Sequence, residues 1–247
     1  MSPLASGALA SLAAGLATGI GALPVLLRWK PSPKLFDGML GFAAGVMLAA
    51  TFFSLLLPAV EAGGPWRALV GFLAGVGLLV AADRLTPHLH FPGGGEGPSS
   101  RLRKIWLFAL AITIHNFPEG LAVGVAFGGG DIAAALSLTV GIALQNMPEG
   151  LAVALPLVGE GYSRGRALFY ATMTGLAEPL AGTLGAVAVV EAAGLLPYGL
   201  AFAAGAMLYV ISDEIIPESH RRGHEFWATG GLVLGFAVMM LLDTLLG

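Results

Sequence analysis

Residues 115–123 read HNFPEGLAV, and residues 145–153 read QNMPEGLAV. Seven of the nine positions are identical, and both copies are set in long apolar stretches. A charged side chain inside a bilayer is costly unless it is paired or faces water, and such residues mark functional sites. The repeated Glu119 and Glu149 therefore indicate a site formed between two related helices of a membrane protein.

The composition of the whole chain also indicates a membrane protein. Of its 247 residues, 56% are hydrophobic and 11% are charged, whereas soluble domains carry about 25% charged residues. So few charges cannot cover a soluble core, and so many apolar residues exclude a disordered chain. The net charge of −3 offers no basic surface for nucleic acid. The absence of cysteine excludes disulfides and thiolate metal sites.

Apolar stretches locate eight expected membrane-spanning helices, judged against the roughly 20 residues that a helix needs to cross the hydrocarbon. They are residues 4–27, 38–60, 68–82, 105–130, 132–159, 167–190, 192–212 and 226–242. The longest connection, residues 83–104, contains His88 and His90 among Pro, Gly and Ser, and we expect a flexible cytoplasmic loop there. The expected fold is an all-α membrane protein of one polytopic domain.

The basic residues predict the orientation in the membrane. Eleven of the twelve fall on connections of one side, and Arg67 alone falls on the other side. Because cytoplasmic loops carry the excess of Lys and Arg, both termini are expected outside the cell. The protein itself is expected in the cell membrane. The first span lacks the basic start of a signal peptide and is expected to remain as a helix.

Residues three or four apart share one helix face, so the first, second and fifth positions of each motif copy converge. They are His115, Asn116 and Glu119 in the first copy, and Gln145, Asn146 and Glu149 in the second. A third carboxylate, Glu178, lies midway along the sixth span. No Lys or Arg lies in any span, so three glutamates require bound protons or a bound cation. Imidazole with carboxylates suits Zn²⁺ and neighbouring divalent ions, whereas oxygen ligands alone would suit Mg²⁺ or Ca²⁺.

The two motif copies, with the later Ala-Glu-Pro, resemble the ZIP (Zrt/Irt-like) metal transporters, and the leading Gln of the second copy resembles their bacterial GufA-like branch. The resemblance implies two inverted three-helix repeats around the fourth and fifth spans. It implies a binuclear centre, with one site formed by Met47, His115, Glu119, Gln145 and Glu149 and a second by Asn116, Asn146, Glu119, Glu149 and Glu178. The branch often has Asp where this chain has Asn146, which removes one negative charge from the second site.

The resemblance further implies alternating access, in which spans one, four, five and six slide against spans two, three, seven and eight. Glycines that recur every four residues, such as Gly41 with Gly45 and Gly231 with Gly235, predict close-packed helix faces. The small-residue faces on spans one and two fit such a sliding surface.

We therefore expect a transporter rather than an enzyme, one that moves Zn²⁺, or else Cd²⁺, Fe²⁺ or Mn²⁺, into the cytoplasm. Its partners are divalent ions and the lipid bilayer, and the sequence leaves a homodimer open. Two other classes stay open. An intramembrane metal hydrolase needs an open water position and a separate general base. A proton-coupled carrier of an organic substrate would use the glutamates as proton relays.

Weaker signals lie near the cytoplasmic side. Asp213 and Glu214 are expected to end the seventh span there, and His220 and His224 follow. These histidines form either an exit relay for the ion or part of a solvated interfacial segment, because Pro217 makes a continuous helix uncertain.

Overall fold

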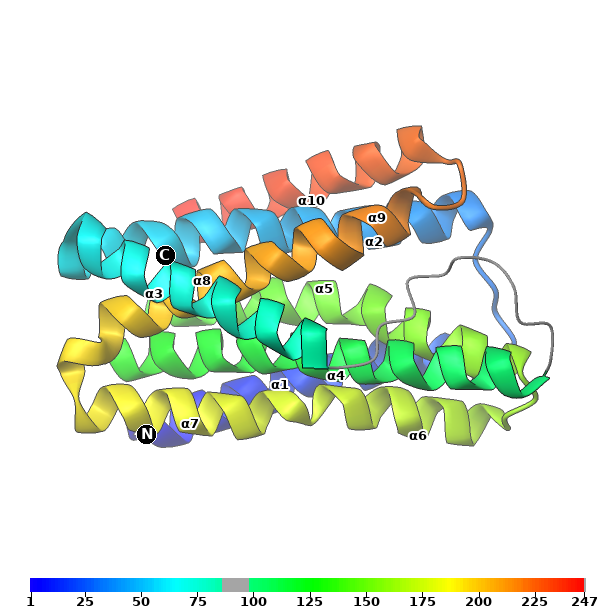
Figure 1. Ribbon diagram of the computed structural model, residues 1–247, viewed down its shortest axis with the longest axis horizontal. Helices are drawn as coiled ribbons and strands as arrows, with labels where there is room; N and C mark the ends of the chain where they lie inside the picture. Colours follow the sequence, from blue (N-terminus) through cyan, green and yellow to red (C-terminus); the bar gives the residue numbers. More distant parts are fainter. Residues whose placement is uncertain (86–97, 247) are drawn as a thin grey trace.

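The structure, a computed structural model, describes residues 1–85 and 98–246 (Figure 1). Within these ranges the chain is helical and contains no β-strand, which confirms the predicted all-α class. The α-helices are α1 (Pro3–Ala22), α2 (Pro33–Ala49), α3 (Leu57–Leu85), α4 (Pro98–Gly129), α5 (Ile132–Gly159), α6 (Arg164–Gly175), α7 (Ala177–Glu191), α8 (Leu196–Val210), α9 (Ile216–His220) and α10 (Glu225–Leu246). Two 3₁₀-helices, η1 (Leu23–Val25) and η3 (Ala193–Leu195), and two π-helices, η2 (Ala50–Leu56) and η4 (Ile211–Ile215), join them.

Seven stretches of the described residues are long and apolar enough to cross a membrane. One of them, Pro33–Ala82, has 50 residues, more than twice the roughly 20 that one crossing needs. Gly64 interrupts it with φ +77° and ψ 168°, a conformation that suits glycine because it has no Cβ. The chain turns back at this end of the bundle, and α3 returns beside α8 (Figure 1).

Several helix boundaries differ from those expected from the sequence. Helices α3 and α4 extend into the expected loop 83–104, to Leu85 and from Pro98, while His88 and His90 lie outside the described residues. The expected sixth span is divided into α6 and α7 at Leu176. Pro179 explains the break, because it has no N–H to donate to the carbonyl one turn earlier.

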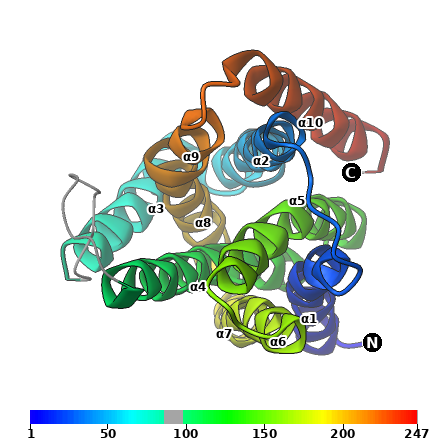
Figure 2. The ribbon, with the colours of Figure 1, turned by 90° about the vertical axis from the view of Figure 1, so that its right-hand side faces the viewer.

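The helices form two bundles, seen end-on in Figure 2. The first bundle contains α1, α4, α5, α6 and α7, and the second contains α2, α3, α8, α9 and α10. Within each bundle, glycines let backbones touch: a Cβ atom on Gly45 would overlap the backbone of α10, and one on Gly124 would overlap the backbone of Gly182. Backbones packed this closely hold each bundle together as a unit.

The boundary between the two bundles is different. Where a glycine of one bundle faces the other bundle, its nearest neighbours there are side chains. These contacts are Gly129 against Leu196, Gly141 against Met239, and Gly199 against Val125. The two bundles therefore meet through side chains rather than through interlocked backbones.

Candidate metal centre

The predicted ligand residues lie in the interior of the protein. Each is at most 2% exposed; they are Met47, His115, Asn116, Glu119, Gln145, Asn146, Glu149 and Glu178. They come from α2, α4, α5 and α7. Because buried polar side chains in proteins are normally hydrogen-bonded, their partners indicate what the site can do.

Close helix packing brings Glu178 to the repeated motif. A Cβ atom on Gly120 would overlap the backbone of Glu178, and one on Gly150 would overlap the carbonyl oxygen of Thr18. The glycine after each motif glutamate therefore lets α4 approach α7 and lets α5 approach α1. These glycines were assigned no role from the sequence. Their identical position in both copies of the motif was a signal that could have indicated this close packing.

Two amide side chains join the helices of the site. Nε2 of Gln145 donates to Oε1 of Glu119, which links α5 to α4. Nδ2 of Asn146 donates to Oε1 of Glu178 at 2.7 Å and to the carbonyl oxygen of Ala14 at 2.9 Å. The two amides therefore fix the relative positions of α1, α4, α5 and α7.

Many other polar atoms of the site have no hydrogen-bond partner among residues 1–85 and 98–246. They are Nδ1 of His115, both amide atoms of Asn116, Oε2 of Glu119, Oε1 of Gln145, Oδ1 of Asn146, both carboxylate oxygens of Glu149, and Oε2 of Glu178. One buried and unsatisfied polar atom costs about 1–3 kcal/mol. The concentration of such atoms in one place fits a site built to bind a polar ligand.

The charges of the site favour a cation. Glu119 is repelled by both Glu149 and Glu178, and Glu178 is repelled by Glu149. A divalent ion among these carboxylates would offset their mutual repulsion and part of the cost of burying them.

The side chains are not arranged as a closed ligand set. In the part of the chain that the structure describes, no three His, Asp or Glu side chains form a group that could hold a metal ion. Glu119 is engaged by Gln145, and His115 is engaged by Glu214. An ion that binds the imidazole and the carboxylates together therefore requires some of these side chains to change position, and the amide oxygens could supply further ligands.

Met47 is placed differently from the other seven residues. It is 1% exposed on α2 and belongs to the apolar core cluster that also contains Leu138 and Ile142 of α5. Its thioether therefore packs in the core next to the first bundle, and its role as a ligand stays a prediction.

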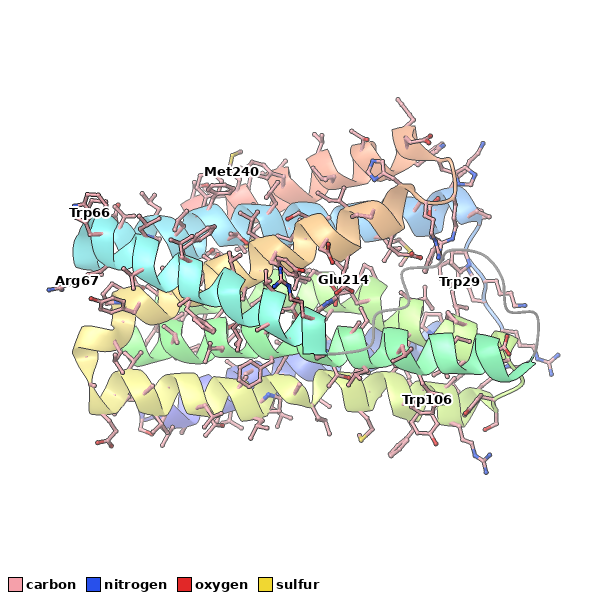
Figure 3. All side chains as sticks on the ribbon, in the orientation of Figure 1. Trp29, Trp66, Arg67, Trp106, Glu214 and Met240 are labelled. Atoms are coloured by element: carbon pink, nitrogen blue, oxygen red, sulfur yellow. The ribbon has the colours of Figure 1, made fainter. Side chains whose placement is uncertain are left out.

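The prediction for Glu214 is wrong. Its sequence position predicts the cytoplasmic end of the seventh span, but Oε1 of Glu214 lies 2.6 Å from Nε2 of His115. Figure 3 shows Glu214 about midway along the bundle, on the stretch that follows α8. The helical span continues to His220 through η4. Hydropathy indicates an end at the first charged residues, but of these only Asp213 is exposed, whereas Glu214 on the same π-helix contacts His115.

His220 and His224, for which the sequence left an ion relay or a solvated segment open, do not lie on one continuous helix. His220 ends α9 and contacts Ser219 and the carbonyl oxygen of Ile216. His224 lies beyond the turn, with Nδ1 2.8 Å from Oδ2 of the fully buried Asp37. These contacts join the turn between α9 and α10 to the start of α2.

Comparison with known proteins gives consistent matches, and the curated relatives cover nearly the full chain. The family model described as ZIP Zinc transporter matches residues 93–243. Zinc transporter GufA of Myxococcus xanthus is 46% identical, over 99% of this chain and 100% of its own length. Zinc transporter ZIPB of Bordetella bronchiseptica is 47% identical, over 95% of this chain and 80% of its own length. Zinc transporter ZIP11 of Homo sapiens is 40% identical, over 93% of this chain and 94% of its own length.

Proposed function

We propose, because the chain belongs to the ZIP zinc transporter family, that it carries zinc across a membrane through the centre formed by α4, α5 and α7. Its relatives are named as transporters, so the chain is a transporter and not an enzyme. That membership disfavours the hydrolase and the organic-substrate carrier that the sequence left open.

The observation that carries the proposal is the group of unpaired polar atoms on His115, the three glutamates and the amides. Zinc binds imidazole nitrogen and carboxylate oxygen, most often with four ligands. Both kinds of ligand are present here, and cysteine is absent from the chain. Cd²⁺, Fe²⁺ and Mn²⁺ accept the same donors and are further candidate substrates.

We assign two adjacent ion sites to this centre. The first consists of His115, Gln145, Met47 and the bridging Glu119 and Glu149. The second adds Glu178, Asn116 and Asn146 to the same two glutamates. Three carboxylates carry a formal charge of −3, which neutralises one divalent ion and leaves a pair of ions at +1. The first site, which has an imidazole, is therefore expected to bind the tighter ion.

The packing of the bundles supports transport by alternating access. Backbones interlock at glycines within each bundle, whereas contacts across the boundary use side chains. Such a boundary can slip more easily than an interlocked one, because side chains can change rotamer without breaking helices. We propose that the first bundle moves along the second and carries the centre from one side of the membrane to the other.

Pairing of the helices supports two inverted repeats. The contact of α4 with α7 is equivalent to the contact of α5 with α1. The contact of α8 with α3 is likewise equivalent to the contact of α2 with α10. Each of α2 and α8 is also followed directly by a π-helix. These equivalences relate the helices before α4 to those after α5, with Pro33–Ala82 crossing the membrane twice and eight crossings in all.

The ends of the molecule support an orientation with both termini outside, and in that orientation we propose that zinc moves into the cytoplasm. Figure 3 shows Trp29 and Trp106 toward one end and Trp66 with Arg67 at the other. All three tryptophans are exposed, as expected for aromatic belts at the two membrane surfaces. We assign the end with Trp29, which carries most basic residues, to the cytoplasm, so that both termini lie outside.

Zinc binding to the purified protein tests the site. After treatment with a chelator, the protein is dialysed against zinc, and the bound metal is measured by elemental analysis. The parent should bind zinc, and Glu149→Gln should bind it much more weakly, because that variant loses a bridging carboxylate. Glu191→Gln, which neutralises an exposed carboxylate at the end of α7, is the matched control and should bind as the parent does. Equal binding by parent and Glu149→Gln would remove this centre from the proposal.

A further inference from the structure

His115 and Glu214 meet from opposite bundles. His115 belongs to α4 of the first bundle, and Glu214 belongs to η4, which follows α8 in the second. Nε2 of the imidazole lies 2.6 Å from Oε1 of the carboxylate, and the imidazole is 2% exposed. The contact is short, and it joins a buried imidazole to a carboxylate that is only partly buried. Glu214 belongs to neither of the proposed ligand sets.

The two ring nitrogens of His115 have different surroundings. Nε2 is held by Glu214, whereas Nδ1 is buried and has no hydrogen-bond partner in the described residues. A histidine that ligates a metal almost always donates its other ring N–H to a carboxylate, a backbone carbonyl or water, which fixes the tautomer and the ring orientation. The contact with Glu214 has that form, with Nδ1 left as the nitrogen that can bind metal.

We propose that Glu214 is a positioning residue, which accepts the Nε2–H of His115 and so presents the lone pair of Nδ1 to the zinc ion. The proposal rests on the proposed function, since it concerns how that centre binds its ion. Glu214 acts through His115 and does not itself touch the ion.

The position of Glu214 gives this contact a second consequence. Because the two residues belong to different bundles, a movement of one bundle along the other separates them. His115 is then held for metal binding only when the bundles are in register at η4. The contact therefore couples ligand orientation to the relative position of the bundles, which helps the ion to bind on one side and leave on the other.

The zinc affinities of three single variants, and of Glu214→Ala in a His115→Ala background, test the positioning role of Glu214. Glu214→Ala should weaken zinc binding by about 10–100-fold, the range found when partners behind a ligating histidine are removed. Glu214→Gln should retain most of the affinity, because its amide oxygen still accepts the Nε2–H. Asp213→Ala, which removes the neighbouring exposed carboxylate, should bind as the parent does. In a His115→Ala background, Glu214→Ala should cause no further loss.

Other results would overturn the proposal. Tighter binding by Glu214→Ala would mean that Glu214 competes with the ion for His115. An equal large loss in Glu214→Ala and Glu214→Gln would mean that Glu214 ligates the ion through its charge. Unchanged affinity in Glu214→Ala, with zinc binding by the parent intact, would remove the positioning role but leave the proposed function. A parent that binds no zinc would overturn both.

The identity of the ligating nitrogen gives an independent readout. Protein labelled with ¹⁵N-histidine and loaded with ¹¹³Cd should show coupling between cadmium and Nδ1 of one histidine, and His115→Ala should remove that signal. Coupling to Nε2 instead would contradict the proposal, whatever the affinities are.

Discussion

Nδ2 of Asn146 lies 2.7 Å from Oε1 of Glu178 and donates a hydrogen bond to it across the interface between α5 and α7. The same nitrogen donates to the carbonyl oxygen of Ala14 on α1 at 2.9 Å. One neutral amide thus satisfies one oxygen of a carboxylate that we assign to the proposed second ion site. In this chain the amide supplies part of the stabilisation that a cation would give.

Asn146→Asp should change both stability and metal stoichiometry. The new carboxylate cannot donate to Glu178 or Ala14 and adds a negative charge beside Glu178. In the metal-stripped protein, the loss should be about 1.5–3 kcal/mol for a hydrogen bond to a charged group, seen as a lower unfolding temperature. With zinc, the variant should reach two ions per chain at lower metal concentration than the parent. Thermal unfolding and elemental analysis, each with and without zinc, check both effects.

Asn146→Ala and Glu178→Ala separate the charge from the lost hydrogen bond. The alanine at 146 should lower the unfolding temperature without raising the stoichiometry, and Glu178→Ala should hold no more than one ion. If Glu178→Ala binds two ions with unchanged affinity, Glu178 is not a ligand and the second site is wrongly assigned.

Gly120→Ala should destabilise the protein, because the added Cβ would overlap the backbone of Glu178 and force α4 from α7. Overpacking costs typically about 1–3 kcal/mol, and here it also moves a proposed ligand. Gly77→Ala is the control, since a Cβ there meets no atom within 4 Å. Unfolding temperature and yield of folded protein in detergent are the measurements. Equal stability of the two variants would count against the close approach of α4 and α7.

Zinc uptake should fall as the external pH is lowered from about 7.5 to about 5, the range in which an ordinary imidazole takes up a proton. Imidazole and carboxylate groups must lose their protons to bind metal, so protons compete with zinc. The midpoint should move to lower pH as the zinc concentration is raised. Initial uptake rates at several zinc concentrations check this, and a flat profile would argue against these ligands.

A disulfide across the two bundles should stop transport. A Cβ atom on Gly199 would lie 3.8 Å from Cβ of Val125, close to the mean Cβ separation in disulfides. Because the chain contains no cysteine, the pair Val125→Cys with Gly199→Cys would be its only thiols. Oxidation should block zinc uptake by preventing movement of the bundles, and reduction should restore it.

The control for this disulfide links two helices of one bundle. A Cβ atom on Gly7 of α1 would lie 3.5 Å from Cβ of Phe127 on α4. Oxidation of Gly7→Cys with Phe127→Cys should leave uptake much less affected. If the disulfide between Val125→Cys and Gly199→Cys forms fully and uptake continues, the bundles do not slide at this boundary.

The helical class and the polar interior could be predicted from the sequence, because both depend on residues that lie close together in the chain. Three glutamates in apolar stretches must face inward, and the repeated motif places two of them on related helices. Hydropathy also locates most spans, because six of the eight expected stretches exceed the roughly 20 residues needed to cross a bilayer.

Features that depend on packing between distant segments could not be predicted in this way. Glu214 follows the apolar stretch by only two residues, so its charge suggests a helix end, and the π-helix Ile211–Ile215 that carries it to His115 leaves no hydropathy signal. The roles of Gly120 and Gly150 depend on which helices face them. A repeating glycine indicates a close approach but does not identify the partner.

The central claim is that zinc crosses the membrane through the centre at Glu119 and Glu149, and uptake into proteoliposomes tests it most directly. Vesicles containing the parent, Glu119→Ala, Glu149→Ala or the exposed control Glu191→Gln receive a mixture of divalent ions, and their contents are read by elemental analysis. We predict that zinc accumulates with the parent and the control, and that both alanine variants, folded in detergent, match protein-free vesicles. Near-normal zinc uptake by either alanine variant, or no metal uptake by the parent, would contradict the account.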